Sequence, residues 1–263
     1  MSSELLTERR DDAIVLTLSD PATRNTLSPQ VYAAGIEALG SAEADRSVRC
    51  VILRGDGAHF CAGGQLQRLA GTRAMGAEAG APHQAQSIDR LHGWIEALRD
   101  FPKPVIAAVE GAAAGAGFSL ALACDLIVAA EDARFVMSYG RVGLSPDGGA
   151  TWHLARQLPR AAALAALWFA DALSAVDLQR LGLVNQVVSP GQALDAALAL
   201  AARLAAMAPN AVASAKQLVN EARSRPLHEQ LDAERGHFVA NLFNANGEEG
   251  IQAFLEKRAP RFR

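Results

Sequence analysis

Two turns made almost entirely of glycine and alanine are the clearest chemical feature of this sequence. One is Cys61-Ala-Gly-Gly64, which follows the apolar run 50–54; the other is 111–117, in which every residue is Gly or Ala, after the apolar run 105–109. Such small side chains let a ligand approach the main chain closely. Where a turn leads into a helix, the first helical N–H groups lack intrahelical partners. Two such turns can aim two N–H groups at one negatively charged oxygen, as in an oxyanion hole.

One carboxylate, Asp147, stands in a further glycine-containing stretch, Pro146–Gly149. A positioned carboxylate is a common general acid or base, so Asp147 is the candidate proton carrier of a site built on the two turns. The same residue could simply cap a helix, because Asp before Gly is a frequent cap and turn residue. We interpret Ser119 as a small packing residue rather than a nucleophile, since no histidine lies at a readable partner spacing.

The apolar segments around these turns predict the elements that position them. Strands are expected in six runs: 5–10, 13–19, 50–54, 105–109, 126–129 and 135–137. Ser28 as N-cap and Pro29 as first helical residue predict a helix start. Helical spacing returns at 87–101, and another helix is expected from about Phe118.

The stretch 71–85 is rich in Gly and Ala with little periodicity, and we interpret it as a mobile loop near the site. We expect the pocket wall to come from 71–90 and from the C-terminal helices. Beyond Thr151 one short apolar run, 183–188, can pair as a strand. The rest is mainly helical, over 160–171, 174–181, 191–207, 209–224 and 226–245. Strand–helix repeats followed by helices predict an α/β core with a helical C-terminal appendage.

The composition limits the class of protein. With 50% hydrophobic and 20% charged residues, this 263-residue chain is globular and long enough for a large core. A net charge of −3 argues against nucleic-acid binding through bulk electrostatics. Three cysteines without a Cys-x-x-Cys pair predict free thiols in a reducing compartment and no metal site. Asp125 inside the apolar stretch 112–130 and a polar N-terminal segment predict a cytoplasmic protein without a membrane span or signal peptide.

Four ordered segments of the sequence resemble the crotonase (enoyl-CoA hydratase/isomerase) superfamily. They are Phe60–Leu66, Pro104–Asp125, Gly143–Gly149 and Phe254–Arg258. The resemblance implies a crotonase-like spiral of ββα units over 1–200 and a helical region over 201–263 that serves oligomerisation and CoA capping. It also implies a homotrimer or a dimer of trimers, an acyl-CoA thioester as substrate, and no permanently bound cofactor.

The same resemblance assigns roles to individual residues. The N–H groups of Gly64 and Ala116 would hold the thioester oxygen. Arg24 would approach the CoA phosphates, and Lys257 would reach the CoA of a neighbouring subunit. The backbone that faces the adenine would be that of Ala62, Gln65 and Leu66.

The sequence departs from the family's hydratases at their two catalytic glutamates. The matching positions hold Ser119 and Tyr139, and Tyr139 could contact substrate or simply fill the pocket. Asp147, eight residues on, matches the functional aspartate of some isomerases and of a dehalogenase. This predicts double-bond isomerisation through an enolate, with Asp147 as acid and base.

Two alternatives stay open at this point. The run 135–147 is most similar to members of the aerobic phenylacetate pathway, which handle ring-derived epoxide or oxepin CoA esters. A water activated by Asp147 would instead give hydration or hydrolysis of such an ester. A protein without the two glutamates could also bind acyl-CoA without reacting it.

Overall fold

The strands form two sheets in the part of the chain that the computed structural model describes, residues 3–263. Met1 and Ser2, the first residues of the polar N-terminal segment, lie outside it. The larger sheet has the order β1-β2-β3-β4-β6-β9, with β1 antiparallel to β2 and parallel pairing from β2 onward. The smaller sheet has the order β5-β7-β8. The strands are β1 Glu4–Arg10, β2 Ala13–Ser19, β3 Cys50–Gly55, β4 Val105–Val109, β5 Ala112–Ala114, β6 Leu126–Ala130, β7 Arg134–Val136, β8 Leu173–Ser174 and β9 Gln186–Val188.

The six strands predicted from apolar runs are present, as is the short strand expected within 183–188. Two strands, β5 and β8, are not predicted. β5 consists of three alanines, which have little tendency to form strands. It exists because it pairs with β7 in parallel, a long-range contact that carries no local sequence signal.

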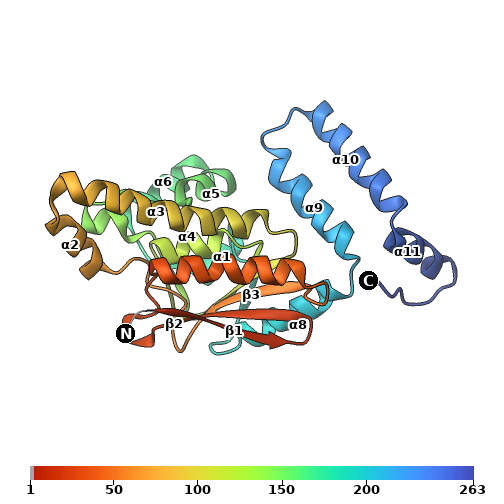
Figure 1. Ribbon diagram of the computed structural model, residues 1–263, viewed down its shortest axis with the longest axis horizontal. Coiled ribbons are helices and arrows are strands. Elements are labelled where there is room, and N and C mark those ends of the chain that lie inside the picture. Colours follow the sequence, from red (N-terminus) through yellow and green to blue (C-terminus); the bar gives the residue numbers. More distant parts are fainter. Residues whose placement is uncertain (1–2) are drawn as a thin grey trace.

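Helices cover both faces of the larger sheet (Figure 1). Ser28 caps the first of them as expected, because its Oγ accepts a hydrogen bond from Val31 N at 3.3 Å. Two 3-10 turns lie at Pro21–Thr23 and Ser138–Val142. The α-helices of residues 3–263 are α1 Pro29–Ala44, α2 Leu66–Ala74, α3 Gly76–Asp100, α4 Ala116–Leu122, α5 Ala150–Gln157, α6 Arg160–Phe169, α7 Ala175–Arg180, α8 Ala193–Ala205, α9 Pro209–Ala222, α10 Leu227–Leu242 and α11 Ala245–Leu255.

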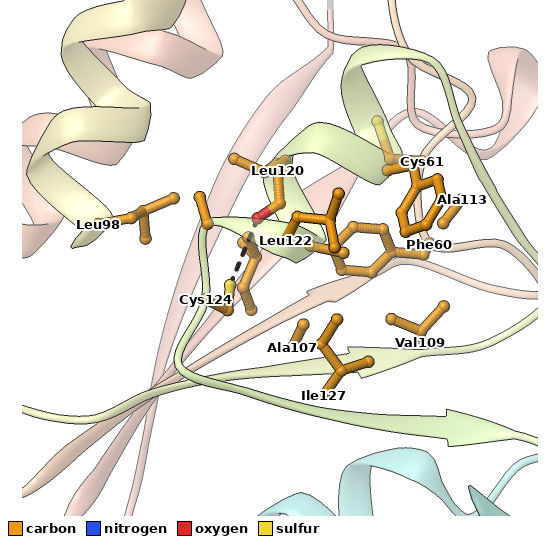
Figure 2. Packing of buried hydrophobic residues seen from close by; sticks show 14 of the residues in the cluster. Phe60, Cys61, Leu98, Ala107, Val109, Ala113, Leu120, Leu122, Cys124 and Ile127 are labelled. Carbon is orange, nitrogen blue, oxygen red and sulfur yellow. Dashed lines mark hydrogen bonds between the residues drawn. The ribbon is translucent and has the colours of Figure 1, made fainter. Parts of the chain in front are cut away.

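The central strands are buried on both faces and divide the core in two. Val51 and Leu53 of β3 belong to the cluster beneath α1, α3 and α4, whereas Cys50 and Ile52 belong to the cluster against α8. This division follows from the two-residue period of a strand. In Figure 2, Leu122 of α4 lies above β4 and β6. α8 packs closely on the opposite face because its buried residues are small: Ala193, Ala197 and Ala201.

The prediction of a mobile loop over 71–85 is wrong, because this stretch is helical. α2 runs to Ala74, and α3 begins at Gly76, whose φ of 78° makes the break between the two helices. Most residues in this part of α3 are exposed. Because no continuous face of the helix is buried there, apolar residues do not recur with helical spacing. The many alanines supply the helical preference instead.

The helical appendage predicted at the C-terminus is present as α9, α10 and α11, which extend away from the sheet (Figure 1). Lys216 anchors α9 to the core, since its Nζ lies 2.8 Å from Asp125 Oδ2 and also donates to Leu98 O. Asp125 in turn accepts from Val105 N at 2.7 Å, as expected of a structural acid. The division at residue 200 lies within α8 and stays a prediction.

Across residues 3–263, no single helix is both long and apolar enough to cross a membrane. The helices α8 and α9 meet the length and composition criteria only when taken together, and they are bent by 109° relative to each other.

Candidate active site

Cys61 joins the two small-residue turns. Its N–H donates to Ala112 O at 3.0 Å, and its carbonyl oxygen accepts from Ala114 N at 2.9 Å. A Cβ on Gly117 would lie 2.4 Å from that carbonyl oxygen, so only glycine permits this approach. Figure 2 shows Cys61 buried beside Ala113 of β5. The two turns singled out in the sequence are therefore neighbours in space.

The N–H groups of Gly64 and Ala116 donate to no protein acceptor within residues 3–263. Their chain neighbours are bonded: Gly63 N donates to Cys61 Sγ at 3.3 Å, and Gly115 N donates to a carbonyl of β7 at 2.8 Å. Ala116 is the first residue of α4, where an N–H has no intrahelical acceptor; the helix starts two residues before the predicted Phe118. Both unpaired amides border the same cavity, as an oxyanion hole would require.

Asp147 is held by the two residues that stand where the family's hydratases carry glutamates. Tyr139 Oη donates to Asp147 Oδ1 at 2.6 Å. Ser119 Oγ donates to the Asp147 carbonyl oxygen at 3.0 Å. Within residues 3–263, no protein donor reaches Asp147 Oδ2. One carboxylate oxygen is therefore oriented by the protein, while the other is available to exchange a proton.

The alternative role for Asp147, capping a helix, does not hold. Gly149 occupies the N-cap position of α5, and no side chain caps that helix. Gly148 and Gly149 have φ values of 60° and 78°, a region that favours glycine. A Cβ on Gly148 would lie 3.0 Å from the Cβ of Ser119. These two glycines let the chain turn from Asp147 into α5 while it stays close to α4.

Tyr139 orients the carboxylate of Asp147 through a hydrogen bond. Its side chain is buried, and burial followed by the nearby Asp147 carboxylate raises the pKa of Tyr139 well above its ordinary value. The phenol therefore remains a protonated donor near neutral pH. Filling the pocket and contacting substrate were the two expected roles, and the structure adds a third, which is to orient Asp147.

A cavity of about 1010 Å³ brings most of the predicted site residues together. Arg24 and Lys257 do not line it, and both have exposed side chains. Arg24 is nonetheless connected to the site, because its carbonyl oxygen accepts from Ala62 N at 2.9 Å. The predicted site residues that do line the cavity are Ala62, Gly64, Gln65, Leu66, Ala116, Tyr139 and Asp147.

Much of the remaining wall comes from α2 and α3. The expectation that 71–90 borders the pocket is confirmed, although it does so as helices. Within residues 3–263 no lining residue lies beyond Thr151, so the C-terminal helices do not form the wall of the single chain as expected. Sequence reasoning missed Tyr32 of α1 and Arg68 of α2. Their spacing indicates only a helix, and the packing of the helices decides that they face the cavity.

A buried histidine lies next to the turn that follows Asp147. His153 of α5 lies beside Gly149 and is 6% exposed. Burial, followed by the guanidinium groups of Arg99 and Arg156, lowers the pKa of His153 to about 4. The folded protein therefore keeps this imidazole neutral at a pH where an exposed histidine would be half protonated.

We expect His153 to make the protein less stable in acid. The pKa of His153 falls from 6.5 in the unfolded chain to about 4 in the fold. Its contribution to the free energy of unfolding is therefore fully present above pH 6.5 and is lost as the pH drops from 6.5 towards 4. The loss amounts to about 3 kcal/mol between pH 7 and pH 4. Urea unfolding at both pH values should show that His153→Gln lacks this dependence, whereas His228→Gln, at an exposed position, retains it. The same pH dependence in H153Q and wild type would contradict the assignment.

Comparison with known proteins places the chain in a family. Residues 8–263 match the family model described as enoyl-CoA hydratase/isomerase. The chain is 36% identical over 263 residues to 1,2-epoxyphenylacetyl-CoA isomerase of Escherichia coli K12, covering 100% of this chain and 99% of that protein. It is 34% identical over 261 residues to 2,3-dehydroadipyl-CoA hydratase of the same strain, covering 99% of each. The crystal structure of an enoyl-CoA hydratase from Polaromonas sp. JS666 has a TM-score of 0.95 and 57% identity, covering 98% of this chain and 99% of that one.

The chain therefore belongs to the enoyl-CoA hydratase/isomerase family of the crotonase superfamily, and it is an enzyme of that family acting on an acyl-CoA. Its α/β architecture is the crotonase fold that the sequence motifs implied. The two Escherichia coli relatives, an isomerase and a hydratase, are about equally similar to it. Similarity alone does not select between their reactions.

Proposed function

We propose that this enzyme moves a double bond within an unsaturated acyl-CoA, with Asp147 as both base and acid. The observation that carries the proposal is that two unpaired amides and one oriented carboxylate border a single cavity. Asp147 Oδ2 takes a proton from carbon 2 or carbon 4 of the acyl group, and the electron pair moves onto the thioester oxygen as an enolate. The carboxyl group then returns the proton to a different carbon, so the product is an isomer of the substrate.

The amides of Gly64 and Ala116 stabilise the enolate. They donate to the thioester oxygen as its negative charge develops, and one such donor typically contributes roughly 3–4 kcal/mol to transition-state stabilisation. Ser119 and Tyr139 replace the two glutamates with which the family's hydratases activate water. Both are engaged with Asp147, which supports proton transfer by one carboxylate over hydration by a pair.

The CoA part of the substrate binds along the segment that follows the first turn. The backbone of Ala62, Gln65 and Leu66 faces the adenine, which is supported by their position on the cavity. Arg24 approaches the phosphates from a loop that is hydrogen-bonded to Ala62. Lys257 reaches the CoA of a neighbouring subunit. The proton carrier belongs to the protein, so this chemistry requires no permanently bound cofactor.

We also propose that the chain assembles as a homotrimer or a dimer of trimers through its C-terminal helices. Large apolar side chains are unusually exposed on α10, α11 and the residues between them. Phe238 is 69% exposed, Phe243 84% and Phe254 83%. Apolar side chains that gather in this way mark an interaction surface.

A second candidate function is hydration or hydrolysis of a ring-derived epoxide or oxepin CoA ester from phenylacetate. The similarity to 1,2-epoxyphenylacetyl-CoA isomerase favours a ring-derived substrate. Asp147 Oδ2, which lacks a protein partner within residues 3–263, could also activate a water. The remaining alternative from the sequence, a protein that binds acyl-CoA without reacting it, is set aside because the chain belongs to a family of enzymes.

Product analysis separates these functions. The purified protein is incubated in D₂O with 2-enoyl-, 3-enoyl- and phenylacetate-derived ring CoA esters, and products are followed by mass spectrometry. Isomerisation in which Asp147 returns the abstracted proton gives a product of unchanged mass and different retention time. Exchange of the carboxyl proton with solvent before its return adds one carbon-bound deuterium. Hydration adds the mass of one water, and hydrolysis releases free CoA thiol that reacts with DTNB.

We expect the isomer, with carbon-bound deuterium only in those turnovers in which the carboxyl proton exchanges with solvent before its return. Formation of the water adduct or of free thiol without that isomer would contradict the proposal and favour the second candidate.

A further inference from the structure

The chain has two tyrosines, and both line the candidate active-site cavity. The hydroxyl of Tyr139 is already used, because it donates to Asp147 at 2.6 Å. The hydroxyl of Tyr32 makes no hydrogen bond to any protein group within residues 3–263. A phenol at the wall of a substrate cavity without a protein partner is available to a bound molecule.

The ring of Tyr32 is held firmly in this position. The side chain is 7% exposed and belongs to the core cluster of α1 and α3. Its ring lies 6.4 Å from that of the fully buried Trp94, measured between centroids, at an interplanar angle of 41°. Trp94 occupies the space above Gly35, one helical turn after Tyr32 on α1, where a Cβ would lie 2.2 Å from the indole. The hydroxyl therefore has little freedom to turn away and find another partner.

The electrostatics of the cavity keep Tyr32 in its donor form. Burial, followed by the Asp147 carboxylate, raises the pKa of Tyr32 well above its ordinary value, and Arg68 opposes this shift only in part. Tyr32 and Asp147 line the same cavity, and the Asp147 carboxylate raises the pKa of both phenols.

We propose that Tyr32 donates a hydrogen bond to an oxygen carried by the acyl group itself, and that the enzyme therefore prefers oxygen-bearing acyl-CoA esters over hydrocarbon ones. This inference rests on the proposed function, in which the thioester oxygen is already taken by Gly64 and Ala116. An acyl chain without a polar atom would cover the Tyr32 hydroxyl and leave it unsatisfied. A chain with a hydroxyl, keto or ether oxygen at that point would satisfy it, so the site discriminates between the two.

The test compares two 3-enoyl-CoA esters of equal length, one plain and one with a keto oxygen beyond the double bond. For each, kcat/KM is measured with wild type and with Tyr32→Phe, which keeps the ring packed on Trp94. We expect the ratio of kcat/KM for the oxygenated ester to that for the plain ester to fall about tenfold in Y32F, the effect of losing one neutral hydrogen bond. A purely structural role would change both values alike and leave the ratio constant.

An unchanged ratio in a variant that melts at the wild-type temperature would overturn the inference. Failure of the proposed function looks different, because wild type would then turn over neither ester. In that case the dissociation constants of the saturated counterparts of both esters, measured by calorimetry, decide the role of Tyr32. A tenfold fall in the binding preference for the oxygenated ester in Y32F supports it, and an equal preference in both proteins overturns it.

Discussion

Replacing Asp147 by asparagine is expected to lower kcat by about 10²–10⁴-fold, the usual contribution of a general acid or base. The variant isolates the chemistry, because an asparagine carbonyl can still accept the hydrogen bond from Tyr139 and the backbone bond from Ser119 does not involve the side chain. An amide cannot take up and return a proton near neutral pH. Steady-state rates with the ester that wild type isomerises measure the effect.

The matched control is Asp132→Asn, which makes the same change in an exposed turn after β6. It should keep wild-type kcat. Binding of a saturated acyl-CoA, measured by calorimetry, should be close to wild type in D147N, since the oxyanion amides and the CoA segment are untouched. Turnover by D147N at the wild-type rate would remove Asp147 from the mechanism.

Replacing Ala116 by proline should cost about 10²–10³-fold in kcat, because it removes one N–H of the proposed oxyanion hole. Side-chain substitution cannot normally delete a main-chain donor, but this position allows it. Ala116 is the first residue of α4, where the helix does not use the N–H and where proline is well tolerated. The loss should appear mainly in kcat, since the amide binds the enolate more strongly than the ground-state carbonyl.

Ala245→Pro provides the control, because it makes the same change at the first residue of another helix, α11, in an exposed position. It should leave kcat unchanged. Thermal melting of both variants shows whether each helix start tolerates proline. A116P with a wild-type melting temperature and wild-type kcat would exclude Ala116 N–H from catalysis.

Much of the scaffold could be predicted from the sequence because its determinants are local. Apolar runs mark β3, β4 and β6, whose faces are both buried. Gly117 is required because a Cβ there would block the close approach of the Cys61 backbone. The small residues of the turns are therefore explained by the backbone contact that they permit. Where the determinant was not local, prediction failed. The exposed alanine-rich start of α3 shows no periodicity, and the three alanines of β5 form a strand only by pairing with β7.

By itself, the sequence determined the family, the two glycine–alanine turns and the candidate acid Asp147, because each depends on residue type and order. The tertiary structure decided how these parts are used. It pairs Tyr139 with Asp147, leaves the amides of Gly64 and Ala116 without protein acceptors, and turns Tyr32 toward the cavity. These parts come from separate segments of the chain, and only the packing of helices on the sheet brings Tyr32, the two amides and the Tyr139–Asp147 pair to one cavity.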